Sequence, residues 1–244
     1  MEAEAYAEMA ALQSSHWWFA GRQKILASQI EQLKLSPNAD ILEIGCGSGG
    51  NLKMLSWFGR VSAVELDAYA RTYAQNLNTG AVDIKAGKLP DDIPFSPNSF
   101  DLVCLFDVLE HIDEDEQSLK ALRSLLKPGG HLIISVPAYQ WLWSTHDVRL
   151  HHKRRYTVGR LKDLAERYGW HVEKQSYFNM FLFPLAAMAR LKDRLLPGGQ
   201  VTGTGMPPAI INTVLEKIFA SEARLIKYMN LSFGVSILMI LKVT

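Results

Sequence analysis

The chain has 244 residues, of which 48% are hydrophobic, and its 26 Lys and Arg nearly balance its 25 Asp and Glu. A chain of this length can bury one large core, so we expect one domain with insertions. The formal net charge of +1 argues against a dedicated nucleic-acid binder, which is usually more basic. Cys46 and Cys104 are the two cysteines, and the first residues lack a signal-peptide pattern, so we expect reduced thiols in a cytoplasmic protein.

Apolar runs alternate with amphipathic segments in the order typical of strand-helix-strand units, which predicts an α/β fold. Helices are predicted at 22–34, 52–55, 68–77, 114–126, 158–167 and 210–229. Strands are predicted at 41–44, 61–65, 81–86, 100–106, 131–136, 171–177 and 234–241, with a turn at 127–130. The run 100–106 is almost entirely apolar, as a central parallel strand buried on both faces should be.

A glycine-rich turn follows the first predicted strand directly. Its glycines leave no Cβ atoms where a ligand must touch the backbone, and they are Gly45, Gly47, Gly49 and Gly50. Glu65 ends the next strand about twenty residues later, where a carboxylate can accept both hydroxyls of a ribose. The pattern predicts a nucleotide cofactor, and both dinucleotides and S-adenosylmethionine are consistent with it. A tight turn without a ligand is the alternative.

Several further motifs accompany the glycine turn in a fixed order. They are Glu43-Ile-Gly45-Cys-Gly47-Ser-Gly49, Glu65, Leu89-Pro90 through Phe95, Ser99-Phe-Asp101, Asp107-Val-Leu-Glu-His111 and Leu126-Lys-Pro-Gly-Gly130. In this order they resemble the class I S-adenosylmethionine-dependent methyltransferases over residues 16–178 and the terminal strand. The segment 100–111 discriminates best, because nicotinamide dehydrogenases do not normally show it.

The resemblance implies a Rossmann-like three-layer sandwich, with a seven-stranded, mostly parallel sheet whose last strand is antiparallel. It implies S-adenosyl-L-methionine as cofactor, S-adenosyl-L-homocysteine as product, and no metal ion. Within a single domain, 1–244, we expect an N-terminal helical lid (1–36), a cofactor-binding core (37–178), a helical insertion (179–230) and a closing strand (231–244).

Carried over residue by residue, the resemblance implies a cofactor site along the carboxyl edge of the sheet. The glycine turn and Glu43 would face the methionine end, and Glu65 would hold the ribose. The implied set is Arg22, Glu43, Gly45, Cys46, Gly47, Gly49, Glu65, Leu66, Lys88, Leu89, Phe106 and Asp107. Lys88 stands where the family often carries an acid for the adenine amine, so adenine contact here would come from the backbone and apolar packing.

His16-Trp-Trp-Phe19 resembles the N-terminal segment of a narrower bacterial subset of this family. We expect these rings to cover the cofactor, with Arg22 pairing with its carboxylate. A hydrophobic staple that anchors the first helix is the alternative. In the family, acceptor-binding residues gather after the fifth strand. The candidate acceptor-binding residues are the two N-terminal tryptophans, Trp17 and Trp18, and four residues after the fifth strand, Tyr139, Trp143, Arg155 and Tyr156.

Methyl transfer from a sulfonium is an in-line displacement, so the protein mainly aligns the acceptor and excludes water. A hydroxyl acceptor also benefits from a base, and the candidates are His111, His146 and His152. Asp147 could orient His146, its neighbour in sequence. The basic run 153–155 suggests an anionic group on the acceptor, with a solvated loop as the alternative.

The uncharged run 177–189 is too short to span a membrane, which needs about twenty apolar residues. It suggests an apolar acceptor, peripheral membrane contact or a dimer contact, with core packing as the alternative. We therefore expect methyl transfer to a small molecule or to a glycan- or lipid-linked acceptor. The alternatives are an RNA methyltransferase, an NAD-dependent oxidoreductase and a non-catalytic cofactor-binding module. The oligomeric state is not indicated.

Overall fold

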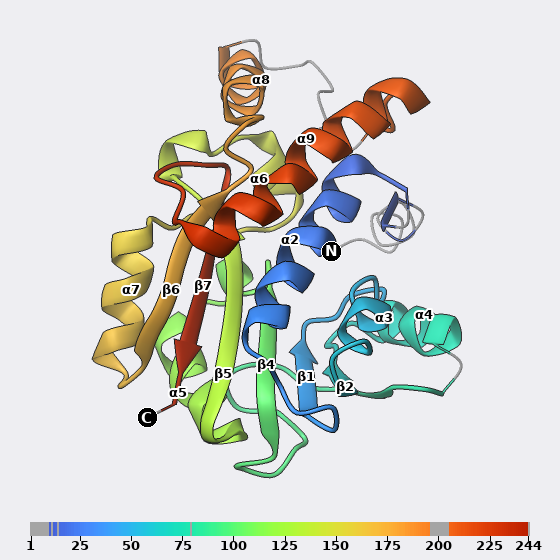
Figure 1. Cartoon of the computed structure of the whole chain (residues 1–244), viewed down its shortest axis with the longest axis vertical. Helices are drawn as coiled ribbons and strands as arrows, with labels where there is room; N and C mark the ends of the chain where they lie inside the picture. Colours follow the sequence, from blue (N-terminus) through green and yellow to red (C-terminus); the bar gives the residue numbers. More distant parts are fainter. Residues whose placement is uncertain (1–9, 11, 14, 79, 196–204, 244) are drawn as a thin grey trace.

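The computed structural model describes residues 10, 12–13, 15–78, 80–195 and 205–243. Within these ranges the strands form one seven-stranded sheet in the order β3-β2-β1-β4-β5-β7-β6 (Figure 1). The strands are β1 (Asp40–Ile44), β2 (Arg60–Val64), β3 (Asp83–Lys85), β4 (Phe100–Phe106), β5 (Leu126–Pro137), β6 (His171–Phe178) and β7 (Ser236–Lys242). Strands β1 to β5 pair in parallel, and β7 runs antiparallel to both β5 and β6. The predicted sheet with its antiparallel last strand is confirmed.

Helices cover both faces of this sheet. They are α2 (Trp17–Gln32), α3 (Leu52–Leu55), α4 (Ala68–Asn78), α5 (Asp115–Leu125), α6 (Thr145–Arg149), α7 (Val158–Arg167), α8 (Phe183–Leu195) and α9 (Ala209–Tyr228), with 3₁₀ turns η1 (Leu109–His111) and η2 (Gln140–Leu142). Successive side chains of a strand point to opposite faces. Leu102 and Cys104 of β4 therefore pack in the core beneath α2 and α9, whereas Val103 and Leu105 pack in the core beneath α5 and α7.

Two boundaries differ from the predicted ones by more than two residues, in both cases for local reasons. The first helix begins at Trp17 rather than at Arg22, because the His16 imidazole accepts a hydrogen bond from the Trp18 backbone N–H at 3.3 Å and caps the helix. Strand β5 begins at Leu126, which pairs with Phe100 across an irregularity in the register. The turn expected at 127–130 therefore belongs to the irregular first part of the strand.

Helices α2 and α9 lie side by side on one face of the sheet, although they come from opposite ends of the chain (Figure 1). They approach closely, because a Cβ on Gly21 would lie only 2.5 Å from the Phe219 ring. The Trp17 ring also packs edge-on against Phe219, at 5.8 Å between centroids. The predicted lid segment thus packs on a helix of the predicted insertion. This contact agrees in part with the alternative that the aromatic residues anchor the first helix as a hydrophobic staple.

The strand order reverses between β1 and β4. From β1 the chain continues to β2 and β3 on one side, whereas β4 and β5 extend the sheet on the other. In open parallel sheets such a reversal leaves a crevice outside the carboxyl ends of the strands. This geometry places a binding site at the ends of β1 and β4. No helix in the ranges above is long and apolar enough to cross a bilayer.

Candidate functional site

A cavity of about 1170 Å³ opens at the carboxyl ends of β1, β2 and β4. One side is formed by the glycine loop after β1, by Glu65 after β2 and by Lys88 and Leu89 after β3. The other side is formed by the segment after β4, by residues 146–155 in α6 and the loop that follows it, and by helix α8. Residues of α2 also line the cavity. We call these two sides the donor side and the acceptor side of the cavity.

The glycine loop exposes its backbone to the cavity at Gly47. Gly45 and Gly47 have φ values of +72° and +55°, in the left-handed region that favours glycine. A Cβ on Gly47 would have nothing within 4 Å, so this residue faces open space. Gly49 does not line the cavity, because its Cβ position lies against Ala74 and Asn78 of α4. The loop therefore offers backbone contact at Gly45 and Gly47.

Glu65 is tied to the glycine loop through its carboxylate. One oxygen accepts a hydrogen bond from the Gly47 backbone N–H at 2.7 Å, and the other accepts one from the Asp67 N–H at 2.8 Å. The residue is 6% exposed and lines the cavity, and burial raises its pKa. The acid expected at the ribose position thus lies beside the loop glycine, as the spacing predicts.

Glu43 lies beneath the loop and does not line the cavity, although the resemblance places it facing the cofactor. Its carboxylate is buried in β1, where the Asn51 side-chain amide donates a hydrogen bond to Oε1 at 2.7 Å. Burial raises the pKa of Glu43 to about 7. Because Asn51 folds back over it, Glu43 holds the loop from below.

Arg22 forms an ion pair with Asp107 at the cavity wall, which joins helix α2 to the end of β4. The Arg22 guanidinium also stacks over the Trp18 ring, 4.7 Å from its centroid. Arg22 is therefore engaged by a carboxylate of this chain, where the sequence suggests a carboxylate of the cofactor. The other expected donor-side residues that line the cavity are Cys46, Leu66, Lys88, Leu89 and Phe106.

The three candidate histidines gather on the acceptor side. His111 and His152 lie 4.8 Å apart between ring centroids, and His146 lies 6.4 Å from His152. All three line the cavity. Burial lowers the pKa values of His111 and His146 to about 4. These two imidazoles are neutral near pH 7 and can accept a proton or ligate a metal ion.

Asp147 is the fully buried centre of the acceptor side. Its Oδ1 lies 2.8 Å from His152 Nδ1 and accepts a hydrogen bond from Arg155 Nε at 2.8 Å, while Oδ2 accepts one from Arg155 Nη2 at 2.9 Å. Burial alone would raise the pKa of Asp147, but the hydrogen bonds with His152 and Arg155 outweigh it and hold that pKa well below its usual range. Asp147 therefore orients His152, not His146 as its place in sequence suggests.

The basic run after α6 is neutralised by carboxylates. Lys153 pairs with Asp113, Arg154 pairs with Asp115 at 2.8 Å and Arg155 pairs with Asp147. The inference of an anionic acceptor from this run is therefore not supported, since each cation already has an acidic partner.

The aromatic acceptor candidates divide between the cavity and the core. Trp17 and Trp18 line the cavity, whereas Tyr139, Trp143 and Tyr156 do not. Tyr156 is buried, and its hydroxyl donates a hydrogen bond to Asp115 at 2.9 Å. The Tyr139 ring stacks on Tyr177, at 5.1 Å between centroids. Tyr139 and Tyr156 are therefore engaged in packing and hydrogen-bonding contacts within this chain.

One residue of the acceptor side was missed at the sequence level, and one wall was expected only as a run of apolar residues. Glu110 is fully buried, and within the described chain neither of its carboxylate oxygens has a hydrogen-bond partner. Glu110 lies inside the motif 107–111, which already marked this segment as part of the site. Helix α8 contributes the apolar side chains Leu185, Ala186 and Ala189 and the charged side chains Arg190 and Asp193, and Leu182 just before the helix extends the apolar wall. Only the uncharged run 177–189 pointed to that wall.

A family model described as a methyltransferase domain matches residues 18–175. The ubiquinone biosynthesis O-methyltransferase of Xanthomonas campestris pv. campestris (strain B100) is 32% identical over 136 residues, which cover 50% of this chain and 56% of that protein. A probable S-adenosylmethionine-dependent methyltransferase of Mycolicibacterium smegmatis is 28% identical over 165 residues, 66% of this chain and 62% of that protein. The chain thus spans little more than half the length of the curated relatives it matches.

Among solved structures, geranyl diphosphate C-methyltransferase from Streptomyces coelicolor A3(2), in a complex that includes S-adenosyl-L-homocysteine, shares the fold. The TM-score is 0.58 at 14% sequence identity, covering 88% of this chain and 75% of that chain. The domain match extends over more than half of the sequence, and the sheet order and the glycine loop agree with it. The chain belongs to the class I S-adenosylmethionine-dependent methyltransferases.

Proposed function

We propose that this protein transfers a methyl group from S-adenosylmethionine to a hydroxyl oxygen of a small acceptor with an apolar portion. The observation that carries the proposal is the arrangement of the groups that line the cavity. Its donor side presents glycine backbone and a carboxylate, and its acceptor side presents three imidazoles and an apolar helix. The name of the Xanthomonas relative, an O-methyltransferase of ubiquinone biosynthesis, supports transfer to oxygen.

The residues of the donor side fit the cofactor. Gly47 offers backbone with no Cβ into open space, and Glu65 offers a carboxylate at the cavity wall. Leu89 and Phe106 supply apolar surface for the adenine ring and the methionine chain of the cofactor. When bound, the cofactor supplies an activated methyl group on a sulfonium, so the protein's task is alignment and exclusion of water. Trp17 and Trp18 at the cavity wall serve that exclusion.

The acceptor side fits a hydroxyl carried on an apolar group. An imidazole can take the hydroxyl proton, and Asp147 fixes His152 for this role through the contact of its Oδ1 with His152 Nδ1 at 2.8 Å. Leu182, Leu185 and Ala186 present an apolar wall at the same cavity. Arg190 donates a hydrogen bond to the Ser144 hydroxyl at 2.8 Å and can meet a polar head group of the acceptor. A lipid- or glycan-linked acceptor has this combination of parts.

A small-molecule acceptor is favoured over RNA because the basic residues 153–155 are already paired with acidic residues of this chain. Phosphate contacts need available cations, but Lys153, Arg154 and Arg155 each pair with a carboxylate of this chain. Transfer of labelled methyl groups to purified RNA, with none to small molecules, would reverse this preference.

Helices α8 and α9 expose apolar side chains near the cavity, and we propose that they contact a lipid surface that carries the acceptor. The exposed residues are Leu185, Met188, Leu191, Ile210, Ile211 and Val214. Leu185 also lines the cavity, so one surface would serve both contacts. Sedimentation with lipid vesicles tests this: the Met188→Gln and Leu191→Gln double variant should sediment less than the wild type. Equal sedimentation would contradict the lipid contact.

The function itself is tested in two steps. Isothermal titration calorimetry should show binding of S-adenosylhomocysteine and none of NADH, and the opposite result would support the dinucleotide alternative. Methyl-labelled cofactor is then incubated with polar and lipid extracts of cells, and label should enter a small molecule. His152→Ala should lower turnover more than cofactor binding, whereas the exposed control His171→Ala should change neither. Cofactor binding with no labelled product from any extract would favour a non-catalytic module.

A further inference from the structure

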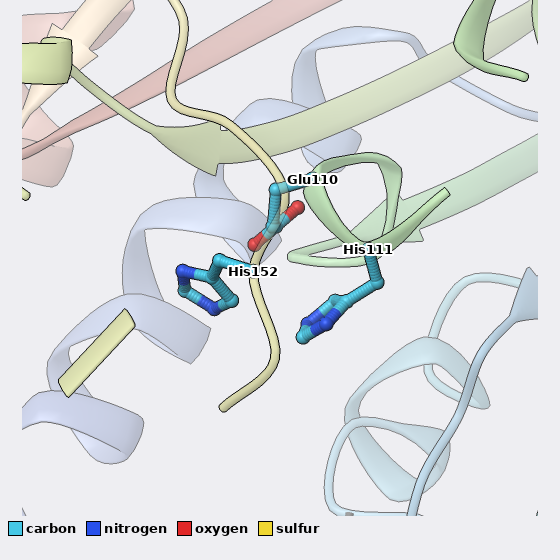
Figure 2. Close-up of side chains that lie close together, drawn as sticks. All are labelled: Glu110, His111 and His152. Atoms are coloured by element: carbon cyan, nitrogen blue, oxygen red, sulfur yellow. The ribbon is translucent and has the colours of Figure 1, made fainter. Parts of the chain in front are cut away.

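Glu110, His111 and His152 bring three metal-ligating side chains together on the acceptor side of the cavity. One ligand atom of each lies within 4.8 Å of the others. Figure 2 shows the Glu110 carboxylate above the two imidazole rings, with His152 coming from a chain segment distant in sequence. We propose that these residues bind a divalent transition-metal ion. The binding does not depend on the proposed function, although the role of the ion does.

The state of Glu110 is the first observation for this site. The residue is 0% exposed, and its two carboxylate oxygens have no hydrogen-bond partner among the residues that the structure covers. A buried carboxylate without a partner is strongly unfavourable, and such groups in folded proteins are paired or coordinate metals. The nearby cations Arg22 and Arg155 are engaged by Asp107 and Asp147. A cation among the three side chains would satisfy Glu110.

The orientation of the two histidines is the second, independent observation. His152 Nδ1 is held by Asp147 at 2.8 Å, which leaves Nε2 as the available ligand atom. Asp147 is itself fixed by Arg155 and by the Ser144 backbone N–H at 2.9 Å. His111 is hydrogen-bonded to the backbone of His151, which leaves its other ring nitrogen. Metal-ligating histidines usually carry such a partner on the second nitrogen, because it fixes the tautomer and the ring.

The donor set indicates which ions fit. Two imidazoles and one carboxylate form the ligand sets of catalytic zinc sites and of non-haem iron(II) sites, whereas magnesium and calcium prefer oxygen ligands alone. Ligand atoms held at 2.0–2.2 Å from one ion in a tetrahedral site lie about 3.3–3.6 Å apart. The three ligand atoms, which lie within 4.8 Å of one another, therefore need to close by at most about 1.5 Å. Metal binding could not be predicted from the residue spacing, since His152 is far from Glu110 along the chain.

Three protein ligands leave coordination positions open toward the cavity. An acceptor hydroxyl could occupy one of them, and the ion would lower the pKa of that hydroxyl. Because the ion would occupy Nε2 of His152, this imidazole would position the ion instead of acting as the base. The hydroxyl proton would then pass to water, leaving an oxygen with greater nucleophilicity beside the donor side. In this role the ion selects acceptors with a ligating oxygen, which deepens the proposed function.

Metal binding is tested directly on the full-length protein, without a turnover assay. The protein is treated with a chelator and dialysed, then titrated with Co²⁺ followed by visible absorption and with Zn²⁺ followed by calorimetry. We expect one ion per chain, with absorption bands typical of nitrogen and oxygen ligation. Glu110→Gln and His152→Ala should each weaken binding at least tenfold, and His171→Ala, an exposed histidine outside the cavity, should not.

Two results would overturn the metal site. One is the absence of stoichiometric Zn²⁺ and Co²⁺ binding by the wild-type protein, and the other is binding that Glu110→Gln and His152→Ala leave unchanged. Circular dichroism and S-adenosylhomocysteine affinity, measured on each variant, show whether the fold and the donor side survive; His111→Asn replaces any variant that does not fold. If the wild-type protein does not bind S-adenosylhomocysteine, the proposed function is wrong. The metal site is not affected by that result, because the metal titration is measured separately.

Discussion

The donor and acceptor sides of the cavity are built in different ways. The donor side consists of short segments at strand ends, and its key contact joins the Glu65 carboxylate to the Gly47 backbone 18 residues earlier. The acceptor side is assembled from segments after β4, after β5 and in α8. These segments are joined by the ion pair of Lys153 with Asp113, 40 residues apart, and by the hydrogen bond from Arg190 to Ser144, 46 residues apart. Donor geometry is thus set by a shorter-range contact to the backbone, whereas acceptor geometry also depends on side-chain contacts between distant segments. The acceptor side can therefore diverge without disturbing the donor side.

The largest expected effect is the loss of cofactor binding in Gly47→Val. A Cβ at this position projects into the cavity, and a β-branched residue is strained at a φ of +55°. Calorimetry should show S-adenosylhomocysteine affinity reduced by about two orders of magnitude or more. Gly129→Val is the matched control, since Gly129 also has a positive φ of 78° and open space but lies outside the cavity. Equal losses in both variants would mean that strain, not contact, explains the result.

Asp147→Asn should break the acceptor side and leave the donor side intact. The substitution leaves Arg155 without a charged partner at a fully buried site, and breaking such a pair costs about 3–5 kcal/mol. Chemical denaturation should show that loss in the free energy of unfolding, while S-adenosylhomocysteine affinity changes less than about threefold. Asp113→Asn removes the exposed partner of Lys153 and should change stability by less than about 1 kcal/mol. A large loss of cofactor affinity in Asp147→Asn would show that the two sides are coupled.

The same difference explains what could be predicted from the sequence. The order and type of the strands, the glycine loop and Glu65 follow from hydrophobic runs and short spacings, which are local. The partner of Asp147 could not be predicted, because the helix end at α6 brings His152 rather than the adjacent His146 to it. Tyr156 and the basic run were misassigned for a related reason: their acidic partners Asp113 and Asp115 lie just before and at the start of α5 and approach only in the folded chain.

Glu65→Ala should produce a smaller effect that is confined to the donor side. Removing the carboxylate deletes the acceptor expected for the ribose hydroxyls and also frees the Gly47 and Asp67 N–H groups. Charge-assisted hydrogen bonds are worth about 1.5–3 kcal/mol, so S-adenosylhomocysteine affinity should fall roughly 10- to 150-fold. Glu65→Gln keeps an oxygen acceptor and should lose less. An unchanged affinity in Glu65→Ala would move the ribose contact to another residue.

The smallest expected effect is a pH-dependent change in the free energy of unfolding that comes from Glu43. It tests whether Glu43 supports the glycine loop or contacts the cofactor. Unfolded, this carboxyl titrates near 4.5, whereas burial in the fold raises its pKa to about 7. Between these values the folded state binds more protons than the unfolded state, so this contribution to stability is lost as the pH rises through 7. Glu43→Gln cannot ionise. The free energy of unfolding of the wild type should therefore fall relative to Glu43→Gln by about 1 kcal/mol between pH 6 and pH 8.

Denaturant titrations of both proteins at several pH values measure this difference, with the exposed Glu166→Gln as the control for loss of a carboxylate. Because Glu43 lies beneath the loop, bonded to Asn51 and outside the cavity wall, S-adenosylhomocysteine affinity at pH 6 should be nearly the same in wild type and Glu43→Gln. A loss of affinity as large as that of Glu65→Ala would instead place Glu43 in contact with the cofactor, as the family resemblance implies. The pair of measurements therefore distinguishes support of the loop from direct binding, which is the finest division within the donor side.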